Sequence, residues 1–376
     1  MRGATGVALG LAALLRGLPL LERHLGLELQ EAYPRNAVIA LLHHDWQPFA
    51  LVHGAVLFDV LRAIYTLWCW CGMLVGAYDV RLDVLAAFVR DPFPFVVVGR
   101  VVVLVASLAG VWTVTWIAAR LGPSRAGPMA ALFLATSFIH VRESVHVWPD
   151  GLAATAAVIT VVFALRFLES GSDRRAAELG VSAGAALACK HALFFLGLPV
   201  ILALWCGGVL SPAARGRRCL VAGVAALVCY LALAPHTLLH WADALFQTRT
   251  QSLGLFGSYE GAGPRLALPF GQLMRLTLGA GPLLLAGLGM VASVWRAPLP
   301  ALVVASFPLA YLVFLAAAFA PFARYFALLS PFVAVFAAIG VASVAGRFAS
   351  ARRPLVAGAL VFAACLAPAR QSWQHV

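Results

Sequence analysis

Long apolar runs separated by short polar intervals make up most of this chain. Within each run the apolar positions are continuous rather than alternating, which argues against a membrane β-barrel. A helix needs about 20 apolar residues to cross a bilayer. The pattern therefore predicts an all-α polytopic membrane protein with about 11 spans. The predicted spans lie near residues 5–21, 93–119, 126–141, 150–168, 176–189, 191–209, 219–236, 267–294, 299–320, 326–346 and 354–369.

The amino-acid composition also indicates a membrane protein. Hydrophobic residues make up 62% of the 376 residues and charged residues 11%, against roughly 45–50% and about 25% in soluble proteins. A soluble fold of this length would not bury so much apolar surface. We expect one integral-membrane domain over residues 1–376 and no soluble domain. Its longest external segments are expected at 22–92 and 237–266, and the second of these would form a lid.

Basic residues indicate the sidedness of the chain. The net charge of +12 does not point to nucleic acid, because no basic run with interleaved aromatic residues lies outside the apolar runs. Lys and Arg mark cytoplasmic loops instead. They predict a cytoplasmic N-terminus and an external C-terminus. The clusters recur at every second connection: Arg120 and Arg125; Arg174 and Arg175; Arg215, Arg217 and Arg218; Arg296; Arg347, Arg352 and Arg353.

The apolar run 49–77 does not fit this sidedness as a simple crossing. The first span leads out and the 93–119 span leads back, so residues 22–92 begin and end outside. The run is then either a tight hairpin or helices lying along the outer membrane surface. Asp59 and Arg62 within it favour the interfacial arrangement. Arg16, near the outer end of the first span, is expected to snorkel to the interface.

The densest polar stretch is LELQEAYPRNAVIALLHHDWQPF, residues 27–49. Glu31, Arg35 and Asn36 occupy positions i, i+4 and i+5, and Pro34 is tolerated if it opens a helix. A carboxylate at the membrane surface would act as a general base toward an acceptor hydroxyl. The alternative interpretation is a solvated interfacial loop.

Three more polar positions fall on the predicted outer side. Asp150 ends the stretch HVRESVHVWPD, where it either caps the next helix or faces the first loop. Lys190 interrupts a long apolar stretch, where a charge is costly, and would bind a phosphate or snorkel at a helix end. Arg324 runs against the positive-inside trend; it would meet a lipid phosphate or form an interfacial anchor with Tyr325. Cations and carboxylates on one face favour a lipid-phosphate-linked donor.

The seven cysteines do not predict a metal site. Cys69 and Cys71 form C-x-C, and no zinc spacing occurs anywhere in the chain. They are expected to act as small buried hydrophobic residues. We predict no cofactor, with a divalent metal as the open alternative.

Five segments carry a family resemblance. They are LQEAYPRNA followed by HHDWQP, the span Arg100–Val114, SVHVWPD, GAALACKH and RYFALLSP. In this order they resemble the polytopic GT-C glycosyltransferases, in particular the protein O-mannosyltransferase and aminoarabinose-transferase-like branch, glycosyltransferase family 39 and its relatives. The ordered set covers most of the chain, whereas no single motif is specific.

The resemblance implies a GT-C-like helix bundle with juxtamembrane helices in the first external loop. It implies an enzyme of the bacterial inner membrane that moves a sugar from a polyprenyl-phosphate carrier to a hydroxyl of a protein, lipid or glycan on the outer face. The assigned residues are Glu31, Asp150 and Gln30 as catalytic; Lys190, Arg324 and Arg35 for the donor phosphate; and Asn36, His146 and Tyr325 for substrate.

Gln30 departs from the family pattern. It stands where the family usually has the Asp assigned as base, and a neutral amide cannot take a proton. Glu31, Asp45 or Asp150 would have to substitute. Alternatively, the chain is a degenerate member that binds a polyprenyl lipid or assists a partner. A transporter or another lipid-modifying enzyme is a further alternative, although paired broken helices and inverted repeats do not stand out.

Overall fold

The computed structural model describes residues 2–22, 32–42, 55–207, 211–256, 271, 274–275, 278–317 and 322–374. Every regular element in these ranges is helical, so the all-α prediction is confirmed. The elements are α1 (Arg2–Gly17), η1 (Leu18–Leu21), α3 (Ala32–Ile39), α4 (Ala55–Leu74), α5 (Arg81–Arg90), α6 (Phe93–Leu121), α7 (Ala126–Ala135), α8 (Phe138–Ser144), α9 (Pro149–Ser170), α10 (Asp173–Cys189), η2 (His191–Leu196), α11 (Gly197–Cys206), α12 (Pro212–Leu233), α13 (Pro235–Leu239), α14 (Trp241–Phe256), α16 (Ala280–Arg296), α17 (Pro298–Ala317), η3 (Ala323–Leu328), α18 (Ser330–Ala345) and α19 (Arg353–Gln374).

The chain is a multi-pass membrane protein. In the described ranges, seven helices are long and apolar enough to cross a membrane, namely α1 with η1, α4, α6, α9, α12, α17 and α19. Four shorter helical segments are also apolar: Ala126–Ala135, His191–Cys206, Ala280–Arg296 and Ser330–Ala345. The number of crossings and their direction stay predictions, because length and composition alone do not fix them.

Two predicted continuous spans are interrupted in the structure. The span at 126–141 is divided between α7 and α8, with Thr136 and Ser137 at the break. At the end of α7 the Thr136 hydroxyl donates to the carbonyl of Leu132 at 3.0 Å, a contact that weakens and bends helices. The span at 267–294 is interrupted at Gly279, whose φ of 82° is left-handed, and α16 begins after it.

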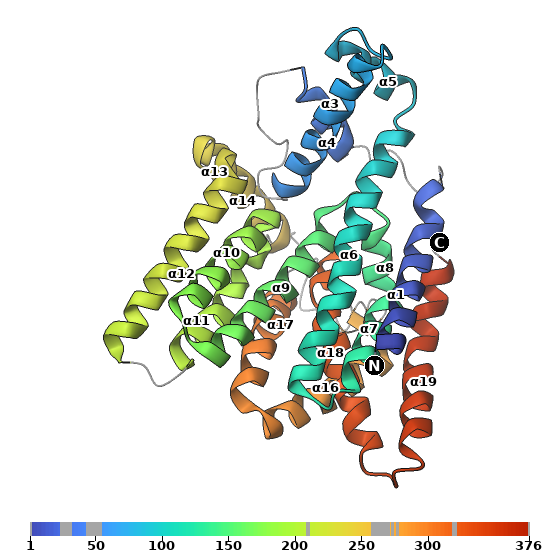
Figure 1. The fold of residues 1–376 in the computed structure, drawn as a ribbon, viewed down its shortest axis with the longest axis vertical. Helices are drawn as coiled ribbons and strands as arrows, with labels where there is room; N and C mark the ends of the chain where they lie inside the picture. Colours follow the sequence, from blue (N-terminus) through green and yellow to red (C-terminus); the bar gives the residue numbers. More distant parts are fainter. Residues whose placement is uncertain are drawn as a thin grey trace, which may run out of the picture.

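The run at 49–77 contains one continuous helix, α4, over the residues that the structure describes. The tight hairpin is therefore wrong for 55–74. Together with α3 and α5, α4 lies beyond one end of the main bundle (Figure 1). Tyr65 of α4 anchors this group, because its hydroxyl donates to the carbonyl of Phe95 in α6 at 2.7 Å. Whether α4 lies along the membrane surface stays a prediction.

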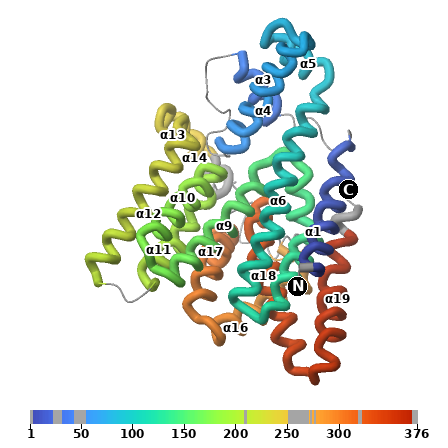
Figure 2. Tube along the Cα trace, viewed as in Figure 1, coloured from blue at the N-terminus to red at the C-terminus, as the bar shows by residue number. Residues whose placement is uncertain are grey.

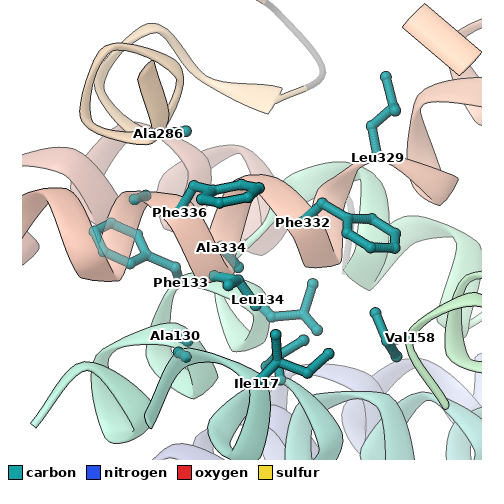
Figure 3. Packing of buried hydrophobic residues seen from close by; sticks show 14 of the residues in the cluster. Ile117, Ala130, Phe133, Leu134, Val158, Ala286, Leu329, Phe332, Ala334 and Phe336 are labelled. Atoms are coloured by element: carbon teal, nitrogen blue, oxygen red, sulfur yellow. The ribbon is translucent and has the colours of Figure 1, made fainter. Parts of the chain in front are cut away.

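The main core joins α6, α7, α9 and α18. Figure 3 shows Ile117, Leu134, Val158 and Phe332 from these four helices gathered in one apolar layer. All four side chains are buried. At the periphery, α1 and α19 lie at the same edge of the bundle (Figure 2). Both pack against α7, and an apolar groove of about 430 Å³ lies between the three helices.

Small residues set the closest helix contacts. A Cβ on Gly289 of α16 would lie 1.8 Å from the Phe336 carbonyl oxygen of α18. A Cβ on Gly180 or Gly184 of α10 would lie 2.2 Å from a carbonyl oxygen of α12. Helices in a bilayer gain little from apolar burial against one another, so close van der Waals packing at small residues holds them together.

Candidate functional site

A buried ion pair lies where α9 begins and α10 ends. The Lys190 ammonium donates to Oδ1 of Asp150, and their side chains are only 6% and 2% exposed. Asp150 makes no capping bond, because Trp148 is the N-cap residue and no side chain caps the helix. The interpretations of Asp150 as a cap and of Lys190 as a snorkelled lysine are therefore wrong. Two positions 40 residues apart in the sequence form one polar centre.

Arg324 of η3 adds a second cation to this centre. Its guanidinium carbon lies 4.9 Å from the ring centroid of Trp148 and 5.7 Å from that of Tyr325. The Lys190 ammonium lies 5.1 Å from the same Tyr325 ring. The two cations thus share the Tyr325 ring, whose face attracts positive charge through the ring quadrupole. The segments around 150, 190 and 324 meet, as the sequence predicts.

The first loop contributes through α3. Tyr33 is buried, and its ring meets that of Trp148 edge to face with centroids 6.1 Å apart. Burial, followed by the charge of Asp150, raises the pKa of Tyr33, whereas Arg324 opposes the rise. Tyr33 therefore lies within electrostatic range of both charged groups. Pro34 falls in the first turn of α3, as expected for a proline that opens a helix.

The two residues of α3 that the sequence analysis assigned to the site, Arg35 and Asn36, make no described contact with the polar centre. Arg35 is exposed, and the Asn36 side chain donates to the Ala32 carbonyl of its own helix at 2.6 Å. No contact described in the structure joins either residue to Lys190 or Arg324. Gln30, Glu31 and Asp45 lie outside the described residues, so their catalytic roles stay predictions.

Glu143 is an acid that the sequence reasoning did not select. It lies on α8 with its side chain 4% exposed, and its Oε1 lies 3.6 Å from Nε of Arg142. Burial and then the negative charge of Asp150 raise its pKa to about 7, and Arg142, Lys190 and Arg324 oppose this rise. A carboxyl group seven positions before Asp150, in the same polar stretch HVRESVHVWPD, was the signal available in the sequence.

His146 lies in the turn between α8 and α9. Its Nδ1 lies 2.7 Å from the carbonyl oxygen of Arg142. Burial lowers its pKa, and the hydrogen bond opposes this effect. The contact stabilises the turn that presents Trp148 and Asp150. The structure thus gives His146 a structural contact, and the substrate-binding assignment stays a prediction.

A buried arginine fixes the position of α8. Arg16 of α1 is fully buried, so its expected snorkelling is wrong. Its guanidinium donates to the Leu134 and Ala135 carbonyls at the end of α7, at 3.2 and 3.0 Å. It also lies 2.8 Å from Nδ1 of His140 and donates to the Ser144 hydroxyl at 3.3 Å. These bonds supply partners to carbonyls at the α7 terminus and join α1 to both α7 and α8.

Arg100 of α6 makes a similar contact with the end of the first helix. One guanidinium nitrogen, Nη1, donates to the carbonyls of Pro19, Leu20 and Glu22 at 2.9–3.1 Å. This bond set fixes the point where the chain leaves η1 toward the first loop. For metals, no group of three or more His, Cys, Asp or Glu residues that could hold an ion occurs among the described residues.

A protein-family comparison matches the centre of the chain. Residues 95–241 match the model described as dolichyl-phosphate-mannose-protein mannosyltransferase. This range includes Asp150, Glu143 and Lys190. No curated protein matches the sequence significantly.

Solved structures match almost the whole chain. ArnT from Cupriavidus metallidurans bound to undecaprenyl phosphate has a TM-score of 0.66 and 15% identity over 99% of this chain and 76% of that one. The apo oligosaccharyltransferase of Archaeoglobus fulgidus has a TM-score of 0.61 and 14% identity, over 99% and 55%. The chain has a GT-C fold. The oligosaccharyltransferase AglB of Archaeoglobus fulgidus, in complex with an inhibitory peptide and a dolichol-phosphate, has a TM-score of 0.60 and 13% identity, over 99% of this chain and 55% of that one.

The resemblance inferred from the ordered motifs is thereby confirmed for the fold. The chain spans about half the length of the archaeal oligosaccharyltransferase and about three quarters of ArnT. The shared part contains the helical bundle and the polar centre described above.

Proposed function

We propose that this chain transfers a sugar from a polyprenyl-phosphate-linked donor to an acceptor hydroxyl. The observation that carries the proposal is the buried centre in which Lys190, paired with Asp150, and Arg324 share the ring of Tyr325. Asp150 pairs directly with Lys190, whereas the described contacts of Arg324 are with aromatic rings, so its positive charge can meet an anionic group. A leaving phosphate is stabilised by positive charge held in place before the reaction.

The comparisons support the choice of donor. The matching family is described by dolichyl-phosphate-mannose, and the two similar solved proteins are bound to undecaprenyl phosphate and to a dolichol-phosphate. In this proposal the lipid lies in the membrane beside the bundle and its phosphate meets Lys190 and Arg324. The acceptor is a protein, lipid or glycan, and nucleic acid is not a partner.

The proposal includes a location. The protein would lie in a bacterial inner membrane with its N-terminus in the cytoplasm and the polar centre on the outer face, because the basic connections alternate along the chain. Residues 22–92 and 237–266 would be external segments of one integral-membrane domain. No cofactor is proposed, and the need for a divalent metal is left to the assay below.

Binding of undecaprenyl phosphate to the protein in nanodiscs tests the donor site. Lys190→Met and Arg324→Leu should each weaken binding by at least about tenfold, because each removes a charge-assisted contact worth about 1.5–3 kcal/mol. Arg174→Met is the control, since that side chain is 88% exposed and pairs with Glu178. Equal affinity in all three variants would refute the phosphate site.

Transfer of labelled mannose from undecaprenyl-phosphate-mannose tests the activity, with and without added Mg²⁺ or Mn²⁺. The product is free mannose with water as acceptor, or mannosylated peptide when a Ser-containing peptide is added. Wild-type turnover establishes an enzyme.

Gln30 favours a second candidate, a lipid-binding member that has lost its base. Turnover only in Gln30→Asp, with lipid binding retained in the wild type, would establish that candidate instead. Loss of wild-type turnover in Glu31→Ala would show that Glu31 is needed for transfer.

A further inference from the structure

We infer that Glu143 takes the proton from the acceptor hydroxyl during transfer. This inference rests on the proposed function and adds a catalytic residue to it. An alcohol that attacks a sugar carbon must lose its proton, and a positioned carboxylate is a common acceptor for it. Two carboxylates of the described residues belong to the polar centre, Asp150 and Glu143.

Asp150 is already committed to another contact. Its Oδ1 accepts the Lys190 ammonium, and both side chains are almost completely buried. Protonating Asp150 would break this pair and leave Lys190 buried without its counter-charge, at a cost of about 3–5 kcal/mol. The role that the geometry gives Asp150 is therefore to hold Lys190 in position.

Glu143 lies close to the same centre but is held more loosely. Its described ion-pair partner is Arg142, at 3.6 Å, and the Arg142 side chain is 41% exposed. The first turn of α9 packs against Glu143 at Gly151, where a Cβ would lie 3.3 Å from the Glu143 carbonyl oxygen. The absent side chain of Gly151 thus lets the first turn of α9 approach the end of α8, and the Asp150 carboxylate acts electrostatically on Glu143 across this contact.

The surroundings of Glu143 act on its ionisation in opposite directions, and the effects that favour the neutral form are the larger. Burial and the Asp150 carboxylate favour its neutral form, whereas Arg142 of α8, Lys190 after α10 and Arg324 of η3 favour its charged form. The net effect raises the pKa of Glu143 to about 7. At neutral pH both forms are then populated, which suits a group that accepts a proton in one step and releases it to water later.

The proposed step balances in atoms and charge. The acceptor oxygen forms a bond to the anomeric carbon while its hydrogen passes to the Glu143 carboxylate. The bond between the anomeric carbon and the donor phosphate oxygen breaks, and its electron pair stays on the phosphate. Polyprenyl phosphate leaves with one more negative charge, beside Lys190 and Arg324. Glu143 afterwards loses the proton to solvent.

An infrared titration tests the protonation state without requiring activity. Difference spectra between pH 5 and pH 9 of the whole protein in lipid should contain a carboxylic C=O band that disappears with a midpoint near 7. The band should be absent in Glu143→Gln and shift with ¹³C-labelled glutamate. A Glu143-dependent band with a midpoint near the ordinary glutamate value of about 4.3 would overturn the inference.

A pH–rate profile tests the catalytic role. With undecaprenyl-phosphate-mannose as donor, wild-type kcat/KM should rise with pH through about 7, because only the carboxylate form accepts a proton. Glu143→Gln should lower the rate by about 10²–10⁴-fold and abolish the rise of kcat/KM near pH 7. Glu143→Asp should recover part of the rate and part of the pH dependence. Glu178→Gln, which removes the charge of a glutamate paired with Arg174 and Arg175, is the control that keeps wild-type behaviour.

The two experiments separate the inference from the proposed function. If wild type transfers sugar and Glu143→Gln keeps both the rate and the rise of kcat/KM near pH 7, Glu143 is not the proton acceptor. The glycosyltransferase proposal would still stand. If wild type transfers nothing from this donor, the proposed mannosyl transfer fails, and the infrared midpoint alone decides whether Glu143 exchanges its proton near neutral pH. Retained binding of undecaprenyl phosphate in Glu143→Gln shows that the variant is folded.

Discussion

At the scale of single residues, variants of the buried pair of Lys190 and Asp150 distinguish its effect on stability from its effect on sugar transfer. Removing one partner leaves an uncompensated buried charge, so Asp150→Leu and Lys190→Met should each lower the free energy of unfolding by about 3–5 kcal/mol. The double variant should recover to within about 1 kcal/mol of wild type, because it buries two apolar side chains of similar size. It should still fail to transfer sugar.

Reversible unfolding in mixed micelles, followed by helical circular dichroism, measures these differences. Additive losses in the double variant would mean that the two side chains do not interact. The exposed pair of Arg120 and Glu169 serves as comparison, since charges 52% and 40% exposed should couple by less than about 1 kcal/mol.

Trp148 provides a second residue-scale prediction. Its ring lies under Arg324 and against Tyr33, so Trp148→Leu removes the surface that orients the guanidinium. The lost cation–π contact is worth about 0.5–2 kcal/mol, which weakens undecaprenyl phosphate binding by between about twofold and thirtyfold. The exposed Trp112 of α6 is the matched control. Binding unchanged in Trp148→Leu but weakened in Trp112→Leu would contradict the arrangement.

Residue by residue, the sequence predicted Lys190, Asp150 and Arg324 of the polar centre but missed Glu143 and the aromatic residues Tyr33 and Trp148. Lys190 was recognisable because a charge inside an apolar run is costly. Arg324 was recognisable because it runs against the positive-inside trend, and Asp150 because it ends a polar stretch on the predicted outer side. Tyr33 and Trp148 gave no such signal, because aromatic residues are common at membrane interfaces. Arg16 was misplaced for a physical reason: carbonyls at the end of α7 offer an inward cation the partners that snorkelling would otherwise seek.

At the scale of helices, the close contact between α16 and α18 requires a glycine at position 289. A Cβ on Gly289 would overlap the Phe336 carbonyl oxygen and lie 2.7 Å from the Gly340 nitrogen. Gly289→Ala must therefore push the helices apart and should lower stability by about 1–3 kcal/mol. Gly287, two positions away in α16, has open space around its Cβ position. Gly287→Ala should be neutral or stabilise by up to about 1 kcal/mol through helix propensity.

Thermal unfolding of the two glycine variants checks this prediction, because both add the same methyl group to the same helix. Equal melting temperatures for Gly289→Ala and Gly287→Ala would show that α16 and α18 are not in close contact. Transfer activity should fall with Gly289→Ala only as far as the folded population does, since this contact lies away from the polar centre.

Helix existence was predictable from apolar length, whereas helix interruptions were not. The break between α7 and α8 depends on Arg16, which comes from α1, more than 100 residues earlier. No local pattern at Thr136 and Ser137 identifies that partner. The single helix at 55–74 likewise shows that Asp59 and Arg62 do not interrupt α4; Asp59 instead has His236 of α13 as a partner at 3.8 Å.

At the scale of the whole molecule, sidedness decides whether the polar centre faces outward. Single cysteines at Arg35, Asp79 and Ser350, all exposed positions, report it in an otherwise cysteine-free chain. A membrane-impermeant maleimide should label Arg35→Cys and Asp79→Cys in intact cells, and Ser350→Cys only after permeabilisation. We expect this labelling pattern because arginine-rich connections, such as that near Arg352, are retained in the cytoplasm.

The same three positions resolve the course of α4, which is long and apolar enough to cross a membrane. If α4 lies along the surface, Arg35 before it and Asp79 after it share one side. If α4 crosses, the two cysteines label from opposite sides, and the pattern of alternating crossings shifts by one from α6 onward. A reversed pattern, with Ser350→Cys labelled in intact cells, would place Lys190 and Arg324 on the cytoplasmic face. A donor presented only on the outer leaflet could not then be the substrate.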